Sequence, residues 1–332
     1  MKVLITGGMG FIGQRLAAEL LERGSLVGPG GDETEIDEIV LFDQAKPKNR
    51  PGWCTDKVKI EAGDISDKDT VNALFDRDDM SVFHLASVVS GGGEKDFNLA
   101  LRVNLNGGLH IFEATRALNG LPRLVFSSTL AVYGGDGMPD NVGDFTKQNP
   151  QTTYGITKAA CELLVNDYTR KGFFDGRTAR LPTVIIRPGK PNAAASSFVS
   201  GLFREPLNGE PMVLPVPTHT VMPVIGYKSI VACLIALHEL DGARLGRDRA
   251  VLLPSHTVSV QEMIEALKRV AHGRELGEIT VDVDPFIEEI VRTWPTDTYF
   301  DRASMLDLPL EKSLDEIVKC YIDDYVDGDW GA

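Results

Sequence analysis

The amino-acid sequence predicts an α/β protein in which a doubly wound parallel sheet is joined to a smaller C-terminal α+β lobe. First, short runs rich in Val, Ile and Leu alternate with segments of helical period over roughly the first 190 residues. These runs are apolar on both faces, which is typical of a parallel sheet with helices packed on each side. Second, the alternation ends after residue 188, where Pro, Gly and Ser become frequent.

Six apolar runs are expected to form the strands of the sheet, with four helices between them. The strands are predicted at 2–6, 38–43, 58–64, 81–86, 123–128 and 183–188. The helices are predicted at 11–23, 67–76, 97–118 and 153–171. Because a helix near 227–240 and a strand near 249–253 are expected to return to the sheet, we predict a first domain of residues 1–188 plus 223–254. Residues 189–222, with a short helix near 196–204, and 255–332 form the second lobe in this prediction.

Charge and cysteine content argue against several classes of function. The 332-residue chain carries 34 basic and 48 acidic residues, a net charge of −14, which disfavours nucleic acid or an anionic membrane as a partner. Its four cysteines have no metal-ligand spacing, so we predict no metal site and a reducing compartment. The start MKVLITGG runs directly into a strand, and the longest apolar run, 230–237, is too short to span a bilayer. We therefore expect a cytoplasmic protein.

A glycine turn follows the first predicted strand and opens the first predicted helix. In the stretch ITGGMGFIG, Gly7, Gly10 and Gly13 have the spacing GxxGxxG. Here Gly7 permits a tight turn, Gly10 lets a diphosphate approach the backbone, and Gly13 lets the helix pack close to the strand. The pattern predicts that the first domain is a Rossmann-type dinucleotide-binding domain, with Phe11 and Ile12 among the cofactor contacts.

Two acidic residues at the ends of predicted strands are candidates for the adenosine half of the cofactor. Asp43 ends the second strand, where a carboxylate accepts hydrogen bonds from both ribose hydroxyls and repels a 2′-phosphate, so NAD is favoured over NADP. Lys46 nearby keeps NADP as an alternative, and Asp43 as a turn cap is another. Asp64 ends the third strand and suits the adenine amino group, with Ile65 beside it; the alternative for Asp64 is a helix cap.

The stretch TTYGITK places a phenol and an ammonium one helical turn apart. Tyr154 and Lys158 share a helical face, beyond the carboxyl end of the fifth strand, where α/β sheets bind their ligands. A phenol of pKa ~10 becomes a usable base if its pKa falls by roughly 2–3 units, and an ammonium at ~4 Å supplies that order of energy. One of the hydroxyls of Ser127, Ser128 and Thr129, at the end of this strand, should donate to the substrate oxygen.

Together, the stretches TGGMGFIG, FHLAS, FSSTLAVYG, TYGITK and IIRPG resemble the extended short-chain dehydrogenase/reductase family over most of the chain. The resemblance implies that Tyr154 is the acid/base, that Lys158 tunes it and binds the nicotinamide ribose, and that Thr129 stands at the position of the usual catalytic serine. Ser127 remains an alternative to Thr129. The further residues that the resemblance assigns to the NAD site are Leu85, Ala86, Asn104 and Pro188.

A narrower resemblance concerns the substrate. The stretches 85–104, 163–177 and 180–211 resemble members of this family that oxidise the 2-hydroxyl of D-erythronate, a four-carbon sugar acid, to a 2-keto acid. Such a substrate needs a cation for its carboxylate and polar groups for its hydroxyls. The residues expected to supply them are Ser90, Ser127, Tyr154, Asn192, Ser196, Ser197 and Arg204, with Arg204 as the cation. Surface or helix-capping polarity is the alternative for most of them.

Two other functions remain open on the same fold. An epimerase of nucleoside-diphosphate sugars would retain NAD through turnover, whereas a redox sensor would bind NAD without turning over a substrate. Loss of Tyr154 or Lys158 is common in such sensors, and both are present here. Dehydration is disfavoured because Leu130, not an acid, follows Thr129. Helices 97–118 and 153–171 are expected to pair across a twofold axis, so we predict a homodimer.

Overall fold

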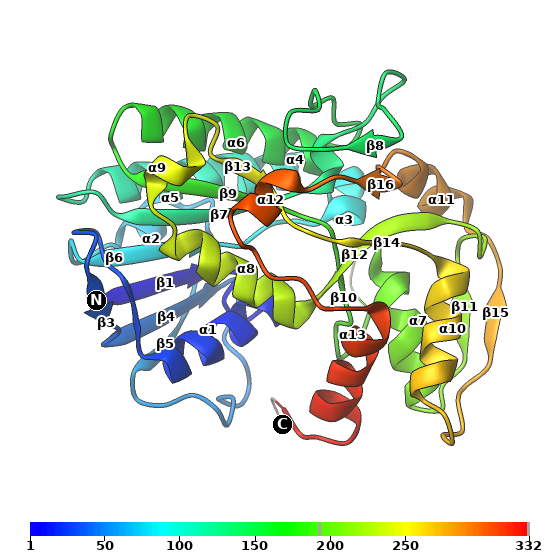
Figure 1. Ribbon diagram of the computed structural model, residues 1–332. Helices are drawn as coiled ribbons and strands as arrows, with labels where there is room; N and C mark the ends of the chain where they lie inside the picture. The colour runs from blue at the N-terminus through cyan, green and yellow to red at the C-terminus, as the bar shows by residue number, and fades with distance from the viewer. Residues whose placement is uncertain (192–193, 331–332) are drawn as a thin grey trace.

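A seven-stranded parallel sheet forms the centre of the larger lobe (Figure 1). The computed structural model describes residues 1–191 and 194–330. The strands of the sheet are β1 (Lys2–Thr6), β4 (Glu38–Asp43), β5 (Val58–Ala62), β6 (Met80–His84), β7 (Arg123–Thr129), β9 (Asp175–Leu181) and β13 (Ala250–Leu252). Their spatial order is β13-β9-β7-β6-β1-β4-β5, so the order reverses between β1 and β6. A reversal of this kind opens a crevice at the carboxyl ends of the strands, where such sheets bind ligands.

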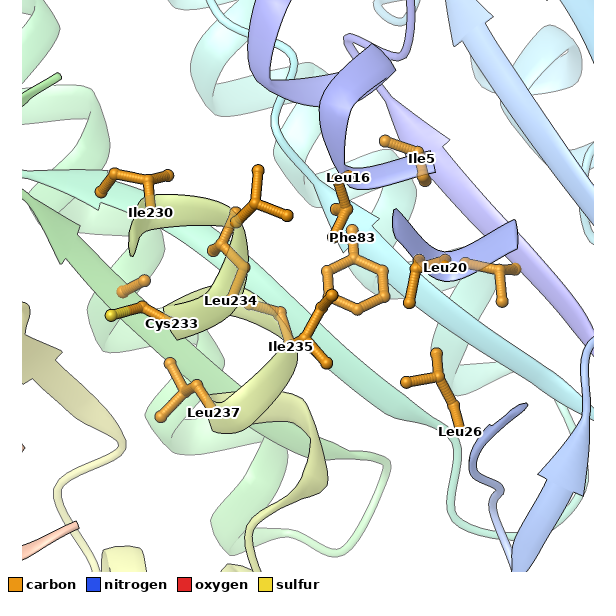
Figure 2. Close-up of a cluster of buried hydrophobic side chains, with 14 of the residues drawn as sticks. Ile5, Leu16, Leu20, Leu26, Phe83, Ile230, Cys233, Leu234, Ile235 and Leu237 are labelled. Atoms are coloured by element: carbon orange, nitrogen blue, oxygen red, sulfur yellow. The ribbon is translucent and has the colours of Figure 1, made fainter. Parts of the chain in front are cut away.

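Helices cover both faces of this sheet, because its strands are apolar on both sides. Val3 and Ile5 of β1 join the core under α1 (Phe11–Arg23) and α8 (Tyr227–Glu239), whereas Leu4 joins the core on the opposite face. Figure 2 shows the first core, in which side chains of α8 meet those of α1 and Phe83 of β6. The opposite face is covered by α2 (Lys68–Asn72), α5 (Gly107–Arg116) and α6 (Thr153–Arg170). The predicted doubly wound α/β fold is confirmed.

The sixth strand along the chain is not the one predicted. The sheet uses β9 (Asp175–Leu181), whereas the run predicted at 183–188 contributes the short strand β10 (Thr183–Ile185) to a different sheet. Two buried arginines of β9, Arg177 and Arg180, make this strand look like a polar loop in the sequence. Pro182 separates the two strands, since proline has no N–H to donate to a ladder.

The smaller lobe has its own apolar core around a three-stranded sheet (Figure 1). This sheet contains β10, β12 (Val221–Gly226) and β14 (His256–Ser259) in that order. Its main helices are α7 (Ser197–Leu207), α10 (Val260–Val270), α11 (Pro285–Arg292) and α13 (Leu314–Tyr321), and a π-helical segment η3 (Ile322–Val326) follows α13. A parallel pair, β11 (Met212–Leu214) and β15 (Ile279–Val281), lies beside α7. The helix predicted near 196–204 corresponds to α7.

Shorter elements connect and join the lobes. In the large lobe these are the hairpin β2 (Ser25–Val27) and β3 (Glu33–Glu35), the helices α3 (Ser90–Lys95), α4 (Phe97–Ala100), η1 (Leu101–Asn106), η2 (Leu130–Val132) and α9 (Gly242–Leu245), and the strand β8 (Asn141–Val142). β8 pairs with β16 (Asp297–Thr298), and α12 (Asp301–Met305) follows. The glycine-rich stretch after β6 contains the helix α3. None of the helices in the described ranges has the length and apolarity needed to cross a membrane.

Candidate active site

A cavity of about 350 Å³ lies at the carboxyl ends of β1, β6 and β7 and takes its walls from both lobes. The predicted site residues that line it are Gly7, Gly10, Phe11, Ile12, Gly13, Leu85, Ser90, Ser127, Thr129, Tyr154 and Lys158. The predicted residues that do not line it are Asp43, Asp64, Ile65, Ala86, Asn104, Pro188, Ser197 and Arg204. Asn192 lies outside the described residues. The structure thus brings most of the predicted nicotinamide and catalytic groups together.

The glycine turn leaves room for a diphosphate. Gly7 has a φ of +67°, and a Cβ there would lie 2.9 Å from the backbone N of Ala86. A Cβ at Gly13 would lie 2.4 Å from the carbonyl oxygen of Gly7, so only glycine lets α1 start this close to β1. Within the described residues no side chain caps the N-terminus of α1, whose first turn contributes to the cavity wall. Uncapped N–H groups at a helix start suit a phosphate, so these residues fit a dinucleotide.

Asp43 lies at the end of β4, beside the glycine turn. Its Oδ2 accepts from the backbone N–H of Met9 at 3.1 Å and its Oδ1 from that of Gln44 at 2.8 Å. The carboxylate therefore braces the turn, as the alternative of a turn cap requires, and its role toward a ribose stays a prediction. The ammonium of Lys46 is 3.2 Å from Glu61, which weakens the NADP alternative.

Asp64 is exposed beyond β5 and does not cap the following helix. Hydrogen bonds from the hydroxyl and the backbone N–H of Ser66 hold the pKa of the Asp64 carboxyl below its usual value. The N-cap of α2 is Asp67, which accepts from Asp69 and Thr70, so Asp64 as a helix cap is wrong. Ile65 is buried against Gly107 at the start of α5.

Tyr154 and Lys158 lie in the first turns of α6, which begins with a capping hydrogen bond from the N–H of Gly155 to Thr152. The Lys158 Nζ donates to the carbonyl oxygen of Ser127 at 2.7 Å and lies 5.8 Å from the centre of the Tyr154 ring. α6 packs against the end of β7 and so places both side chains beside the hydroxyl residues of that strand.

Burial dominates the protonation of this pair. Burial raises the pKa of Tyr154 to about 12, against a smaller lowering by the Thr129 hydroxyl. Burial also lowers the pKa of Lys158 to about 8. The lowering of the phenol pKa that was expected from Lys158 is not seen in this arrangement, where burial raises the pKa of Tyr154 and the ammonium lies 5.8 Å from the ring centre. The role of Lys158 toward Tyr154 stays a prediction.

The structure distinguishes between the candidate hydroxyls on β7. Ser127 Oγ donates its proton to the carbonyl oxygen of His84 at 3.1 Å. Thr129 Oγ1 instead accepts from the backbone N–H of Ala131 at 3.1 Å, and its hydroxyl is hydrogen-bonded to the Tyr154 phenol. Ser128 Oγ is buried and has no partner among the residues described. Thr129 is thus the hydroxyl of this strand that lies beside the Tyr154 phenol.

Asn104 does not reach the cavity but organises its wall. It belongs to the π-helical segment η1, a kind of helix distortion that is frequent at functional sites. Its Oδ1 accepts from the backbone N–H of Val88 at 2.7 Å, and its Nδ2 donates to the carbonyl oxygen of Val88 at 3.0 Å and to Thr157 on α6 at 3.2 Å. Asn104 thereby fixes the chain after β6 relative to α6.

Arg187, not Arg204, is the arginine that faces the cavity. Arg204 is buried in α7, where its guanidinium donates to the carbonyl oxygen of Arg187 at 2.9 Å and pairs with Glu205. Arg187 lines the cavity, its guanidinium donates to the carbonyl oxygen of Lys190, and burial together with the neighbouring Arg204 charge lowers its pKa. The prediction of Arg204 as the carboxylate ligand is therefore wrong. The stretch IIRPG contains Arg187 directly before Pro188, and this position could have indicated an arginine at the cavity.

The remaining substrate candidates lie where α3 meets α7. Ser90 is buried, lines the cavity and accepts from the backbone N–H of Ala195 at 3.2 Å. Ser196 lines the cavity, whereas Ser197 does not. Thr183 and Trp294 also line it and were not predicted from the sequence.

Comparison with known proteins identifies the family. The NAD dependent epimerase/dehydratase family matches residues 3–239. The chain belongs to this family. The D-erythronate dehydrogenase of Cupriavidus necator is 44% identical over 98% of both chains, and that of Haemophilus influenzae is 37% identical over 97% of this chain and 99% of its own. A solved structure described as a nucleoside-diphosphate-sugar epimerase from Agrobacterium tumefaciens is 37% identical, with a TM-score of 0.89 over 99% of this chain and 96% of that one.

Membership of the epimerase/dehydratase family confirms the resemblance to extended short-chain dehydrogenases/reductases and implies a nicotinamide cofactor. The names of the similar proteins divide between dehydrogenases and an epimerase, although the sequences and folds are close. Within such a family the fold does not decide the reaction, so the function must be argued from the groups that line the cavity.

Proposed function

We propose that this protein is an NAD-dependent dehydrogenase that oxidises the 2-hydroxyl of a small sugar acid, with D-erythronate as substrate and 2-keto-D-erythronate as product. The observation that carries the proposal is the charge of the cavity. Lys158 and Arg187 are cations, and no Asp or Glu is among the described residues that line it, although the chain has a net charge of −14. Such a cavity suits an anionic substrate, and the two D-erythronate dehydrogenases among the relatives support this choice.

In the proposed reaction each polar group has one task. Arg187 holds the substrate carboxylate by charge-assisted hydrogen bonds. Thr129, which is hydrogen-bonded to the Tyr154 phenol, orients the reacting hydroxyl toward Tyr154, and Tyr154 takes the hydroxyl proton as general base. Lys158 contributes a positive charge that favours the phenolate of Tyr154. Hydride acceptance is the chemistry that a bound nicotinamide supplies, and Asp43 is the group that selects NAD through the ribose hydroxyls.

The alternative is a nucleoside-diphosphate-sugar epimerase, because one solved relative at 37% identity carries that description. Both reactions use a tyrosine base and a nicotinamide, so Tyr154 and Lys158 do not separate them. The difference lies in net reduction of the cofactor. A dehydrogenase accumulates NADH in proportion to its substrate, whereas an epimerase regenerates NAD in each turnover.

The experiment that tests the proposal follows NADH absorbance in the purified protein with NAD and a panel of four-carbon aldonates, with UDP-sugars in parallel. We expect NADH formation with D-erythronate and little with NADP. Tyr154→Phe should abolish this rate and leave NAD binding intact. No NADH with any acid, together with NAD that copurifies and conversion of a UDP-sugar, would replace the proposal by the epimerase.

We also propose that the protein is a homodimer. Three large apolar side chains are more than half exposed on the two helical segments expected to pair: Phe97 on α4, and Ile156 and Leu163 on α6. Ile156 and Leu163 are seven residues apart and therefore share one face of α6. Sedimentation equilibrium of the native chain and of the Ile156→Glu/Leu163→Glu variant tests this, with a dimer expected for the first and a monomer for the second.

A further inference from the structure

Trp294 stands at the boundary between the candidate active site and a second space in the small lobe. A pocket of about 570 Å³ lies beside β12, β14 and α11. Among the described residues, Trp294 is the only one that lines both this pocket and the 350 Å³ cavity. Trp294 thus lies where the two spaces approach each other, and we use the word partition for this residue.

The backbone that carries Trp294 is anchored on both sides. Its N–H donates to the carbonyl oxygen of Val291 at 3.1 Å, at the C-terminal end of α11 in the small lobe. Three residues later, β16 pairs with β8 of the large lobe, where Asp297 is opposite Asn141. The chain thus crosses from one lobe to the other at this point, and the position of the partition is set by backbone contacts and not by the indole ring.

The ring itself is held by packing alone. Its Nε1 is buried and has no hydrogen-bond partner among the residues that the structure describes. The ring packs at the edge of the apolar core of the small lobe. Replacement of Trp294 by a small residue therefore breaks no hydrogen bond of the side chain, and its first effect is to join the two spaces.

The space behind the ring is polar enough to take more of a sugar-acid chain. The polar groups that line it are His219, Thr220, Thr257, Glu288, Arg292, Thr296 and Asp297. Thr257 Oγ1 donates to Asp297 Oδ1 at 2.6 Å, so this pair presents both a hydroxyl and a carboxylate to the pocket. Hydroxyl groups of a five- or six-carbon aldonate would find hydrogen-bond partners here, whereas in the smaller cavity the ring stands in their path.

We propose that Trp294 sets the chain length of the acid that the enzyme accepts: the indole closes the substrate cavity and excludes aldonates longer than four carbons from the polar pocket behind it. This inference rests on the proposed dehydrogenase function and adds the determinant of its substrate size.

The test compares kcat/KM for D-erythronate and for a five- and a six-carbon aldonate in the wild type, Trp294→Ala and Trp294→Phe. In Trp294→Ala the ratio of the six-carbon to the four-carbon value should rise by at least about tenfold, the order that a difference of one or two carbons makes in a shaped pocket. Trp294→Phe keeps a ring in the partition and should hold the ratio within about threefold of the wild type. If Trp294→Ala does not fold, Trp294→Leu must shift the ratio in the same direction.

A second variant shows where the longer chain lies. Thr257→Val in the Trp294→Ala background should reduce kcat/KM for the six-carbon acid severalfold and leave that for D-erythronate unchanged. If Trp294→Ala lowers kcat/KM equally for acids of every length, so that the ratio is unchanged, the inference is overturned. The proposed function still stands in that case, provided that the wild type oxidises D-erythronate. A wild type that oxidises no aldonate overturns the proposed function and this inference with it.

Discussion

Replacement of Lys158 by methionine should make the protein more stable at neutral pH, although it removes a proposed catalytic group. The Lys158 ammonium is almost fully buried, and burial lowers its pKa from 10.5 to about 8. Carrying this charge at pH 7 therefore costs about 3 kcal/mol of folding free energy. Methionine removes that cost but leaves the Ser127 carbonyl without its donor at 2.7 Å, a loss of about 1–2 kcal/mol. The net expected gain is about 1–2 kcal/mol.

The sign of this effect should depend on pH. Since the folded-state pKa lies below the unfolded-state value, the unfolded chain binds more protons between pH 8 and 10.5, and wild-type stability rises through that window. Near pH 10.5 the buried Lys158 is neutral and its burial costs little free energy. The variant then differs mainly by the lost hydrogen bond to the Ser127 carbonyl oxygen, so Lys158→Met should be the less stable protein. Urea unfolding at pH 7 and at pH 10.5 measures both differences.

Lys2 supplies the matched control. It is equally buried, but its Nζ lies 2.8 Å from Asp76 and 2.7 Å from the carbonyl oxygen of Leu74. Lys2→Met removes both hydrogen bonds, leaves Asp76 and the Leu74 carbonyl without this donor, and should destabilise the protein at pH 7. A Lys158→Met variant that is less stable than wild type at pH 7, or whose difference from wild type is the same at both pH values, would refute the reasoning.

Three further predictions concern binding and stability. Arg187→Ala should raise KM for the acid by about 10–150-fold, which is the contribution of a hydrogen bond to a charged group. KM for NAD should not change, and Arg187→Lys should recover part of the loss. An unchanged KM for the acid in steady-state kinetics would contradict the role of Arg187. Asp43→Ala should shift the ratio of kcat/KM for NAD over NADP toward NADP, and a constant ratio would remove Asp43 from cofactor selection. Arg180→Met removes the guanidinium that lies 2.8 Å from the buried Glu162 carboxylate and should lower the free energy of unfolding by about 3–5 kcal/mol. Urea unfolding measures this difference, and a decrease below about 1 kcal/mol would contradict the prediction.

The sequence was sufficient for the sheet wherever the middle of a strand is a continuous apolar run. β1, β4 and β7 were predicted within a residue of their ends because both faces of these strands are buried. β9 was missed because Arg177 and Arg180 interrupt its apolar pattern. These arginines are tolerated inside the fold because Asp175 and the Leu240 carbonyl oxygen pair with Arg177 and because Glu162 pairs with Arg180. Leu240 and Glu162 lie on other elements, so a pattern of residues within the strand does not reveal them.

In the candidate site, the spacing of residues in the sequence identified side chains that lie close together on one helix. It did not identify side chains whose positions depend on how separate elements pack. Tyr154 and Lys158 are one helical turn apart, so their common face followed from the sequence. Which arginine faces the cavity depends on how α7 packs: the helix buries Arg204 against Glu205 and leaves Arg187 exposed to the ligand space. Likewise, the choice of Thr129 over Ser127 needed the two hydrogen-bond directions, which no pattern of hydroxyl residues reveals.

The placement of β13 at the far edge of the large sheet has a consequence for synthesis on the ribosome. The chain leaves this sheet after β9, builds α7 and β12 in the small lobe, and only then returns with α8 and β13. Until α8 emerges, the apolar side chains that Ile230 and Leu234 cover in the finished protein face water. The first 188 residues therefore lack the helix that covers one face of their sheet and the strand that pairs with β9. A chain that ends between β9 and β13 would leave β9 as an edge strand that is unpaired on one side, the kind of edge on which chains aggregate.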